Sequence, residues 1–181
     1  MTLEEKYNQL CNTPSDINEH LPTLKEYASQ CKHVTEMGVR GIVSTYALLM
    51  GKPKTMKSYD IAPCNWEPIK DLVKEDTDFK FEIGNTLEIE IEPTELLFID
   101  TLHNYNQLSV EFKKHAPMVS NYIILHDTTS FEHHGESYTG KVELGLWPAV
   151  TEFLQNNPEW SIHRRYRNNN GLTILQRKSP N

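Results

Sequence analysis

The sequence has few cysteines, no long apolar run and no excess of positive charge. Its 181 residues include 3 cysteines without Cys-x-x-Cys spacing, which favours free thiols in a reducing compartment. The N-terminus is acidic and lacks the apolar core of a secretion signal, and no apolar stretch approaches the length of a membrane span. We therefore expect a cytoplasmic protein with no membrane partner.

The charge balance argues against a nucleic-acid partner. The formal net charge is −7, whereas a broad nucleic-acid footprint needs clustered Lys and Arg. One basic cluster is present, at residues 164–167, and we interpret it as a solvated strand end rather than a phosphate site. No internal repeat or linker is visible, so residues 1–181 are expected to form one domain, with 1–31 as an N-terminal helical extension.

The spacing of apolar residues predicts alternating strands and helices. Strands are expected at 33–37, 55–61, 79–83, 96–99, 122–125, 160–166 and 172–176, and helices at 16–30, 44–50, 66–74, 108–115 and 142–155. The last two strands flank an Asn-Asn-Asn-Gly turn, which is typical of a β-hairpin. The order predicts an α/β fold, namely a Rossmann-like, doubly wound, mostly parallel sheet with a C-terminal antiparallel β-hairpin.

A glycine turn follows the first predicted strand. The turn reads Glu36-x-Gly38-x-x-Gly41, and the second strand ends in Asp60. Glycines let the backbone approach a ligand, and an acid at the second strand end accepts hydrogen bonds from ribose hydroxyls. The Gly-x-Gly-x-x-Gly of dinucleotide sites is missing, and Glu36 would repel a pyrophosphate. The pattern instead suits a cofactor with an amine and a sulfonium, such as S-adenosylmethionine.

Acids and histidines follow the fourth and fifth strands. Asp100 and His103 come after the run 96–99, and His126 and Asp127 come after the run 122–125. Right-handed crossovers bring these strand ends to one edge of the sheet. A single strand-end acid can simply cap a helix, but two acids with two histidines favour a functional site. Two carboxylates suit Mg²⁺, and an imidazole shifts the preference toward Mn²⁺ or Fe²⁺. Alternatively, His103 or His126 is a general base.

Two further segments have a functional and a simpler interpretation. Asn85 follows the third strand, where its side chain could bind an adenine edge, although Gly84-Asn85 also serves as a plain turn. Residues 131–136 read Phe-Glu-His-His-Gly-Glu. The His and Glu residues could bind a metal ion, but they lack the spacing of ligands on a regular element. We therefore interpret the segment as a mobile active-site flap rather than a metal site.

Four segments together resemble a known family. Residues 36–45, 58–60, 98–105 and 124–128 are similar to class I S-adenosylmethionine-dependent methyltransferases, closest to the branch often labelled cephalosporin hydroxylase-like. The resemblance spans about residues 30 to 177, and its most specific features are Asp-x-x-His-x-Tyr and His-Asp-Thr after successive strands. Ile42 stands where many members have a second glycine, so Gly41 would take that place with a shifted turn.

The resemblance implies roles for individual residues. Glu36 and Gly38 would lie near the methionine portion of the cofactor, Asp60 on the ribose and Asn85 near the adenine. Asp100, His126 and Asp127 would hold a divalent ion such as Mg²⁺ or Mn²⁺. The implied cofactor site as a whole comprises Glu36, Gly38, Gly41, Ser44, Thr45, Asp60, Asn85, Thr86, Asp100 and His103.

The expected function is an S-adenosylmethionine-dependent O-methyltransferase that acts on a small polar acceptor such as a carbohydrate hydroxyl. Asp100, His103 and His126 are its candidate catalytic residues. One alternative is a non-catalytic module that binds a nucleoside or S-adenosylmethionine on the same sheet. Another is a nucleic-acid methyltransferase, which the acidic balance disfavours. Without a separate substrate domain, the acceptor pocket has to come from loops, the N-terminal helix or a neighbouring subunit of a homo-oligomer.

Overall fold

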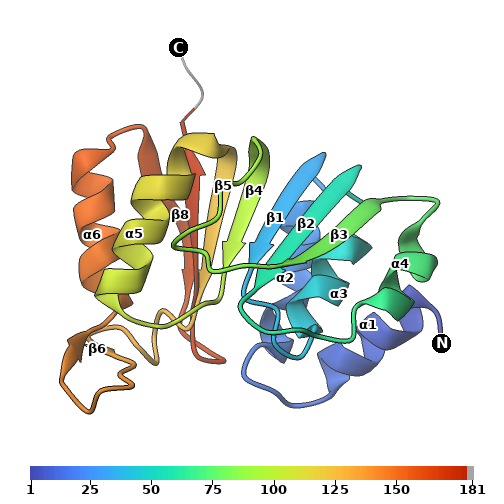
Figure 1. Cartoon of the computed structure of the whole chain (residues 1–181), viewed down its shortest axis with the longest axis horizontal. Coiled ribbons are helices and arrows are strands. Elements are labelled where there is room, and N and C mark those ends of the chain that lie inside the picture. Colours follow the sequence, from blue (N-terminus) through green and yellow to red (C-terminus); the bar gives the residue numbers. More distant parts are fainter. Residues whose placement is uncertain (179–181) are drawn as a thin grey trace.

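A seven-stranded sheet forms the centre of the computed structural model, which describes residues 1–178 (Figure 1). Its order is β3-β2-β1-β4-β5-β9-β8. The strands are β1 (His33–Met37), β2 (Thr55–Asp60), β3 (Asp78–Ile83), β4 (Thr94–Ile99), β5 (Val119–His126), β8 (Trp160–Tyr166) and β9 (Leu172–Arg177). Strands β1 to β5 are parallel, and β9 runs antiparallel to both β5 and β8. The predicted fold, a mostly parallel sheet with a C-terminal hairpin, is confirmed.

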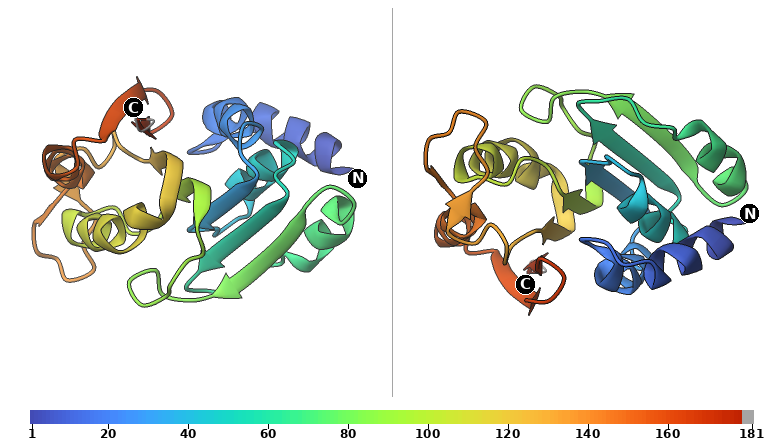
Figure 2. Two further views of the ribbon diagram at one scale, coloured as in Figure 1. Left: turned by 90° about the horizontal axis from the view of Figure 1, so that it is seen from above. Right: turned by 90° about the horizontal axis from the view of Figure 1, so that it is seen from below.

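Helices cover both faces of this sheet. They are α1 (Leu3–Asn12), η1 (Asn18–His20), α2 (Leu21–Ala28), α3 (Val43–Met50), α4 (Glu67–Val73), α5 (Tyr105–His115), η2 (Ala116–Met118) and α6 (Leu146–Asn156). Figures 1 and 2 show α5 and α6 together on one side and α1 to α3 together on the other. None of the helices within residues 1–178 has the length and apolar character that a membrane crossing requires.

The central strands are buried on both faces, which explains their unbroken apolar runs. In β4, Leu96 and Phe98 pack into the core beneath α1 to α4, whereas Leu97 and Ile99 pack into the core beneath α5 and α6. Successive side chains of a strand point to opposite faces, so a strand covered on both sides needs an apolar residue at every position. The polar residues that follow such a run are thereby left at the edge of the sheet.

Some helix boundaries in the structure differ from the predicted ones, and one helix was not predicted. The helix expected at 16–30 is divided into η1 and α2, because Pro22 occupies the first turn of a new helix. Helix α1 was not recognised separately, although Thr2 and Glu5 form a capping box at its start. The helix expected at 142–155 starts only after Gly145, and the residues before it form the short pair β6 (His134–Gly135) and β7 (Glu143–Leu144).

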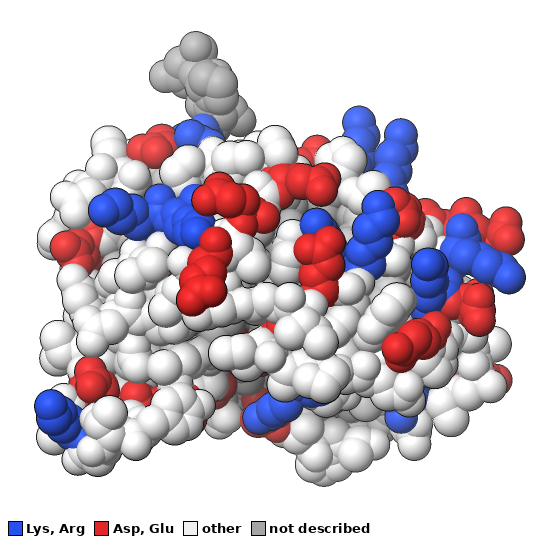
Figure 3. All heavy atoms as spheres, in the orientation of Figure 1, with Lys and Arg blue, Asp and Glu red and all other residues white. Residues whose placement is uncertain are grey.

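The surface drawn in Figure 3 has Lys and Arg side chains scattered among Asp and Glu rather than gathered in one basic area. Ion pairs occur among the described residues, with Lys57 Nζ 2.9 Å from Glu82 Oε1 and Lys80 Nζ 3.2 Å from Asp78 Oδ2. Where positive and negative side chains alternate, the net electrostatic attraction for a phosphate backbone is weak. This face therefore has no broad basic patch for a nucleic acid.

Candidate functional site

The glycine turn after β1 lies directly against the end of β4. Gly38 has a φ of +86°, and its N–H donates to the Tyr59 carbonyl at 2.9 Å. A Cβ built on Gly38 would lie 2.0 Å from the carbonyl oxygen of Asp100. Both the left-handed backbone and the close approach require glycine. The turn that was predicted to approach a cofactor is thus also in contact with the strand end that carries Asp100.

The second glycine of the turn does not play the expected part. Gly41 does not adopt a positive φ, whereas Ile42 does, at 64°. A Cβ on Gly41 would meet only Val43 Cγ2, at 3.8 Å. The prediction that Gly41 replaces the missing glycine through a shifted turn is therefore wrong. The β-branched Ile42 itself adopts the left-handed conformation, where its side chain packs against the core beneath α1 to α4.

Asp60 closes the glycine turn onto β2. Its Oδ2 accepts the N–H groups of Val39 at 2.7 Å and Arg40 at 2.9 Å, and its Oδ1 accepts that of Ala62 at 2.8 Å. Burial alone would raise the pKa of Asp60, but these backbone amides outweigh it and lower the pKa. The ionised carboxylate offers about four acceptor positions. A ribose hydroxyl, the partner predicted for this residue, would share the carboxylate with these amides.

Two isoleucines beside Asp60 were missed by the sequence reasoning. Ile61 follows Asp60 and is 76% exposed, and Ile83, which pairs with Asp60 in the sheet, is 63% exposed. Large apolar side chains left in water at neighbouring strand ends indicate a surface that contacts a ligand. The available signal was their position, immediately at the carboxyl ends of β2 and β3.

Glu36 lies beneath the turn and not at the surface. Its side chain is fully buried and accepts hydroxyl hydrogen bonds from Ser44 at 2.6 Å, Thr45 at 2.8 Å and Ser58 at 2.6 Å. Burial outweighs these bonds and raises the pKa of Glu36 to about 7. The side chains of Glu36, Ser44 and Thr45 thus bond to one another. A cofactor could meet them as predicted only if these buried hydrogen bonds were broken.

The segment after β3 is fastened to α5. Asn85 uses its side-chain oxygen to accept the N–H of Leu87 at 3.0 Å, as in a polar turn. Thr86 is buried and donates its hydroxyl to the buried Glu111 at 2.6 Å. Asn85 therefore lies at the predicted strand end with an exposed neighbour in Ile83, whereas Thr86 faces the protein interior.

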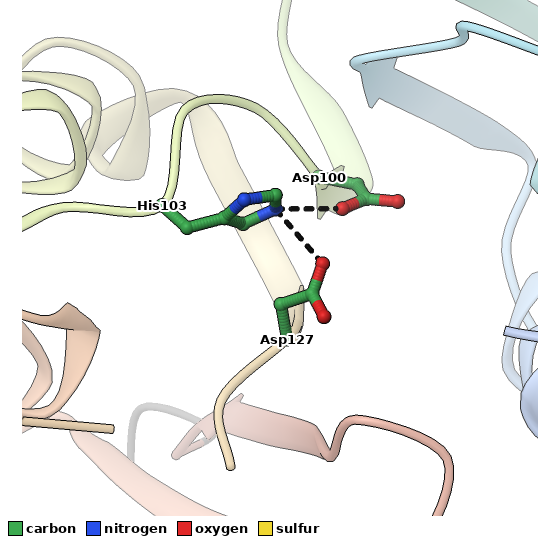
Figure 4. A group of neighbouring side chains, drawn as sticks. All are labelled: Asp100, His103 and Asp127. Atoms are coloured by element: carbon green, nitrogen blue, oxygen red, sulfur yellow. Dashed lines mark hydrogen bonds and ion pairs between the residues drawn. The ribbon is translucent and has the colours of Figure 1, made fainter. Parts of the chain in front are cut away.

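Asp100, His103 and Asp127 converge at the ends of β4 and β5 (Figure 4). His103 Nε2 lies 3.2 Å from Asp100 Oδ1 and 2.9 Å from Asp127 Oδ2. His126 joins from the other side, with Nδ1 at 3.4 Å and 3.3 Å from the same two oxygens. The convergence predicted from the sequence thus exists in the fold.

The electrostatics of this cluster follow from two facing carboxylates. Burial disfavours the charged form of each group, yet the mutual hydrogen bonds outweigh it. They lower the pKa values of Asp100 and Asp127 and raise those of His103 and His126 to about 10. Two such carboxylates repel unless positive charge lies between them. Either protonated imidazoles or a metal ion could supply it.

Asp127 has two unusual features. Its φ is 58°, which is rare for a residue other than glycine. No helix begins directly after Asp127, so the residue is not a helix cap. Its Oδ1 is buried with no hydrogen-bond partner among residues 1–178. A buried carboxylate oxygen without a partner is costly, and such strain is typical of functional sites. A cation beside Asp127 would supply the missing partner of Oδ1.

The remote nitrogens of both histidines are also held. His103 Nδ1 lies 3.1 Å from Glu136 Oε2, and the ring of Phe131 stacks on that of His103 at 4.7 Å. His126 Nε2 lies 3.1 Å from the carbonyl oxygen of Asp16. Metal-binding histidines usually donate their second nitrogen in this way. Glu136 and Phe131 were expected only as part of a flap, and their contact with His103 was not predicted.

The three-residue group that could hold an ion differs from the predicted one. Ligand atoms of Asp100, His103 and Asp127 all lie within 4.8 Å of one another. His103 therefore replaces His126 in the set expected from the resemblance. The side chain of His126 is almost fully buried, whereas that of His103 retains 19% exposure.

A separate cavity lies away from this edge. It has a volume of about 560 Å³ and is lined by residues of α5, α6 and the hairpin, including Phe112, Phe153 and Trp160. None of the residues predicted for the site lines it. Its position on the α5–α6 side does not alter the assignment of the site to the strand ends.

No family model matches this sequence, and neither does any curated protein. Solved structures do match over nearly the whole chain. The N-methyltransferase NodS from Bradyrhizobium japonicum, in complex with S-adenosyl-L-homocysteine, has 12% identity and a TM-score of 0.66, over 99% of this chain and 100% of that chain. An O-methyltransferase from Bacillus cereus, also in complex with S-adenosyl-L-homocysteine, has 15% identity and a TM-score of 0.63, over 97% and 90%.

A third match is the N-terminal domain of EvdMO1, solved in the presence of S-adenosyl-L-homocysteine and D-fucose. It has 10% identity and a TM-score of 0.60, over 93% of this chain and 85% of that chain. Identities this low establish a common fold and leave the activity open. The chain shares the fold of these methyltransferase structures and of the EvdMO1 domain.

Proposed function

We propose that this protein is an S-adenosylmethionine-dependent O-methyltransferase with a small polar acceptor. The observation that carries the proposal is the contact between two sites predicted independently. The Gly38 turn, closed by Asp60, lies against the Asp100 carbonyl, and Asp100 belongs to the cluster with His103 and Asp127. A cofactor seated on the turn would present its reactive end to that cluster.

The residues around Asp60 fit the adenosine portion of the cofactor. Bound S-adenosylmethionine would supply a methyl group already activated by its sulfonium. Asp60 would accept a hydrogen bond from the ribose, and the exposed Ile61 and Ile83 would cover the faces of the adenine. Gly38 lets the turn pack against the Asp100 carbonyl, and the methionine portion would pass along this turn. The chain's remaining task is to align the acceptor oxygen with the methyl group and to remove its proton.

Replacing Asp60 by asparagine should weaken binding of S-adenosylhomocysteine at least tenfold, about 1.4 kcal/mol, because the charged acceptor for the ribose is lost. Asparagine keeps one oxygen for the amides of Val39 and Arg40 and so preserves the turn. Titration calorimetry measures the change. Asp78→Asn, an exposed acid at the opposite end of the neighbouring β3, is the matched control. Equal affinity in Asp60→Asn and the control would remove Asp60 from the ribose site.

The residues of the cluster fit a divalent ion. Two carboxylates and one imidazole are a ligand set suited to Mg²⁺ or Mn²⁺, and the unpartnered Asp127 Oδ1 provides a further donor. We assign the ligands as Asp100, His103 and Asp127. A bound ion would lower the pKa of the acceptor hydroxyl. In a metal-free enzyme, His103 is the candidate base, because its side chain is the more exposed of the two histidines. It would accept a proton only in its neutral form, whose share is small at neutral pH because Asp100 and Asp127 raise its pKa to about 10.

Removal of the metal separates these two mechanisms. After exhaustive chelation, we expect methyl transfer to fall at least tenfold, about 1.4 kcal/mol in activation free energy, and to return when Mn²⁺ or Mg²⁺ is added. Binding of S-adenosylhomocysteine, measured on the same samples, should persist because Asp60 and the Gly38 turn do not depend on the ion. Unchanged turnover in the chelated enzyme would leave His103 as the base without a metal.

The proposed acceptor is a carbohydrate hydroxyl. The EvdMO1 domain, solved with a sugar present, has the same fold, which is compatible with a carbohydrate hydroxyl. The acceptor surface would come from the segment at Asp16, the flap at Glu136, or a second subunit. Transfer of a labelled methyl group to a panel of sugars and phenols tests this. Binding of S-adenosylmethionine without transfer to any acceptor would favour a non-catalytic binding module.

A further inference from the structure

The flap expected at residues 131–136 is part of a longer segment, residues 131–145, which contacts the cluster through Glu136. We use "flap" for these residues, which include β6 and β7. The flap begins at Phe131, whose N–H donates to the Asp127 carbonyl at 3.0 Å, and closes where the N–H of Leu146 donates to the Phe131 carbonyl at 2.8 Å. Its tip carries the exposed Tyr138 and Val142. Both ends of the flap are therefore fixed beside Asp127.

Glu136 connects the flap to the loop after β4 at three points. Its carboxylate lies 3.1 Å from His103 Nδ1, and its backbone N–H donates to the His103 carbonyl at 2.9 Å. Its own carbonyl accepts from Asn104 Nδ2 at 3.2 Å. Phe131, at the base of the flap, stacks on the same imidazole with an interplanar angle of 9°. The flap thus contacts Nδ1 and one face of the His103 ring, while Nε2 on the opposite edge faces Asp100 and Asp127.

The contact with Glu136 suits the tautomer that a neutral His103 would need to bind a cation. A neutral imidazole that donates through Nδ1 has its lone pair on Nε2. Nε2 is the atom that points between Asp100 and Asp127, at 3.2 Å and 2.9 Å from their oxygens. Without an acceptor at Nδ1, the ring could turn or take the other tautomer, and no lone pair would face the carboxylates.

We propose that Glu136 is a positioning residue that couples ion binding at Asp100, His103 and Asp127 to closure of the flap. The proposal rests on the metal site proposed above. Closure of the flap orients His103 for ligation, and a bound ion in turn favours the closed flap. Because such coupling is reciprocal, each event strengthens the other by the same factor.

The first test is binding of Mn²⁺ alone, followed by calorimetry, to the wild type and three variants. Glu136→Ala removes the acceptor and should weaken binding about 10- to 100-fold. Glu136→Gln loses the charge but keeps an oxygen for Nδ1, so its affinity should return to within about threefold of the wild type. Glu143→Ala removes an acid from β7 of the same flap, where it accepts from Asn106 at 3.3 Å, and should have no effect.

The second test is hydrogen exchange of the flap with and without Mn²⁺. The ion should slow exchange at residues 131–145 in the wild type and in Glu143→Ala, but not in Glu136→Ala. Wild-type affinity in Glu136→Ala, or equal losses in Glu136→Ala and Glu136→Gln, would overturn the positioning role while leaving the metal site intact. A wild type that binds S-adenosylhomocysteine but no Mn²⁺ would overturn the metal site, and the coupling with it, without touching the proposed cofactor site.

Discussion

Gly38→Ala is expected to lower the free energy of unfolding by about 2–5 kcal/mol. The left-handed φ of +86° is unfavourable for alanine, and the new Cβ would lie 2.0 Å from the carbonyl oxygen of Asp100. That contact joins two backbones, so neither can move aside without displacing β1 or β4. Urea denaturation followed by circular dichroism measures the change.

The control for this prediction lies three residues away. Gly41→Ala should change the free energy of unfolding by less than about 0.5 kcal/mol, because its φ is not positive and the added Cβ would make one ordinary contact. Binding of S-adenosylhomocysteine should decrease in the folded fraction of Gly38→Ala and remain unchanged in Gly41→Ala. Equal stability of the two variants would mean that the Gly38 turn does not press against β4 in solution.

Glu36→Ala should destabilise the protein by about 3–5 kcal/mol. The substitution leaves the hydroxyls of Ser44, Thr45 and Ser58 without their common acceptor in a region sealed from water. Glu36→Gln has nearly the same shape, and hydroxyl groups can both donate to and accept from an amide. It should therefore retain most of the stability, which makes it the matched comparison.

The pH dependence of Glu36→Gln follows from the raised pKa of the buried acid. Its pKa is about 7 in the folded protein, against 4.5 without the protein environment. A pKa raised by folding contributes stability that is present below pH 4.5 and is lost as the pH rises through 7. Between pH 5 and pH 8, Glu36→Gln should therefore gain about 2–3 kcal/mol relative to the wild type.

Denaturation curves of both proteins at pH 5, 6, 7 and 8 measure this difference, because all other titrating groups are shared. A difference that stays constant with pH would show that Glu36 is ionised in the folded state throughout. Binding of S-adenosylhomocysteine by Glu36→Gln should remain within about threefold of the wild type, because the carboxylate is buried beneath the turn. A larger loss would support the direct contact with the cofactor that the resemblance implies.

The sequence by itself determined the sheet and the edge at which the site lies. The apolar runs at 96–99 and 122–125 are long enough to be buried on both faces, and this pattern depends only on the alternation of side chains along a strand. The same local pattern of strand followed by polar or glycine residue also predicted the positions of the acids after each run, of Asp60 and of Gly38. The helix starts at Leu21 and Leu146 were not predicted, because the proline and glycine near them allow more than one start.

Only the tertiary structure decided which way the polar side chains face and which histidine meets which acid. Glu36 lies one residue before the end of β1, and Asp60 is the last residue of β2. The first is buried against the hydroxyls of Ser44, Thr45 and Ser58, whereas the second accepts backbone amides of the glycine turn. His103 lies between Asp100 and Asp127, and its other nitrogen meets Glu136 of the flap, 33 residues further along the chain. Sequence periodicity reports the face that a residue occupies within its own element. The partner across a loop depends on how distant segments pack, and that information is in the fold alone.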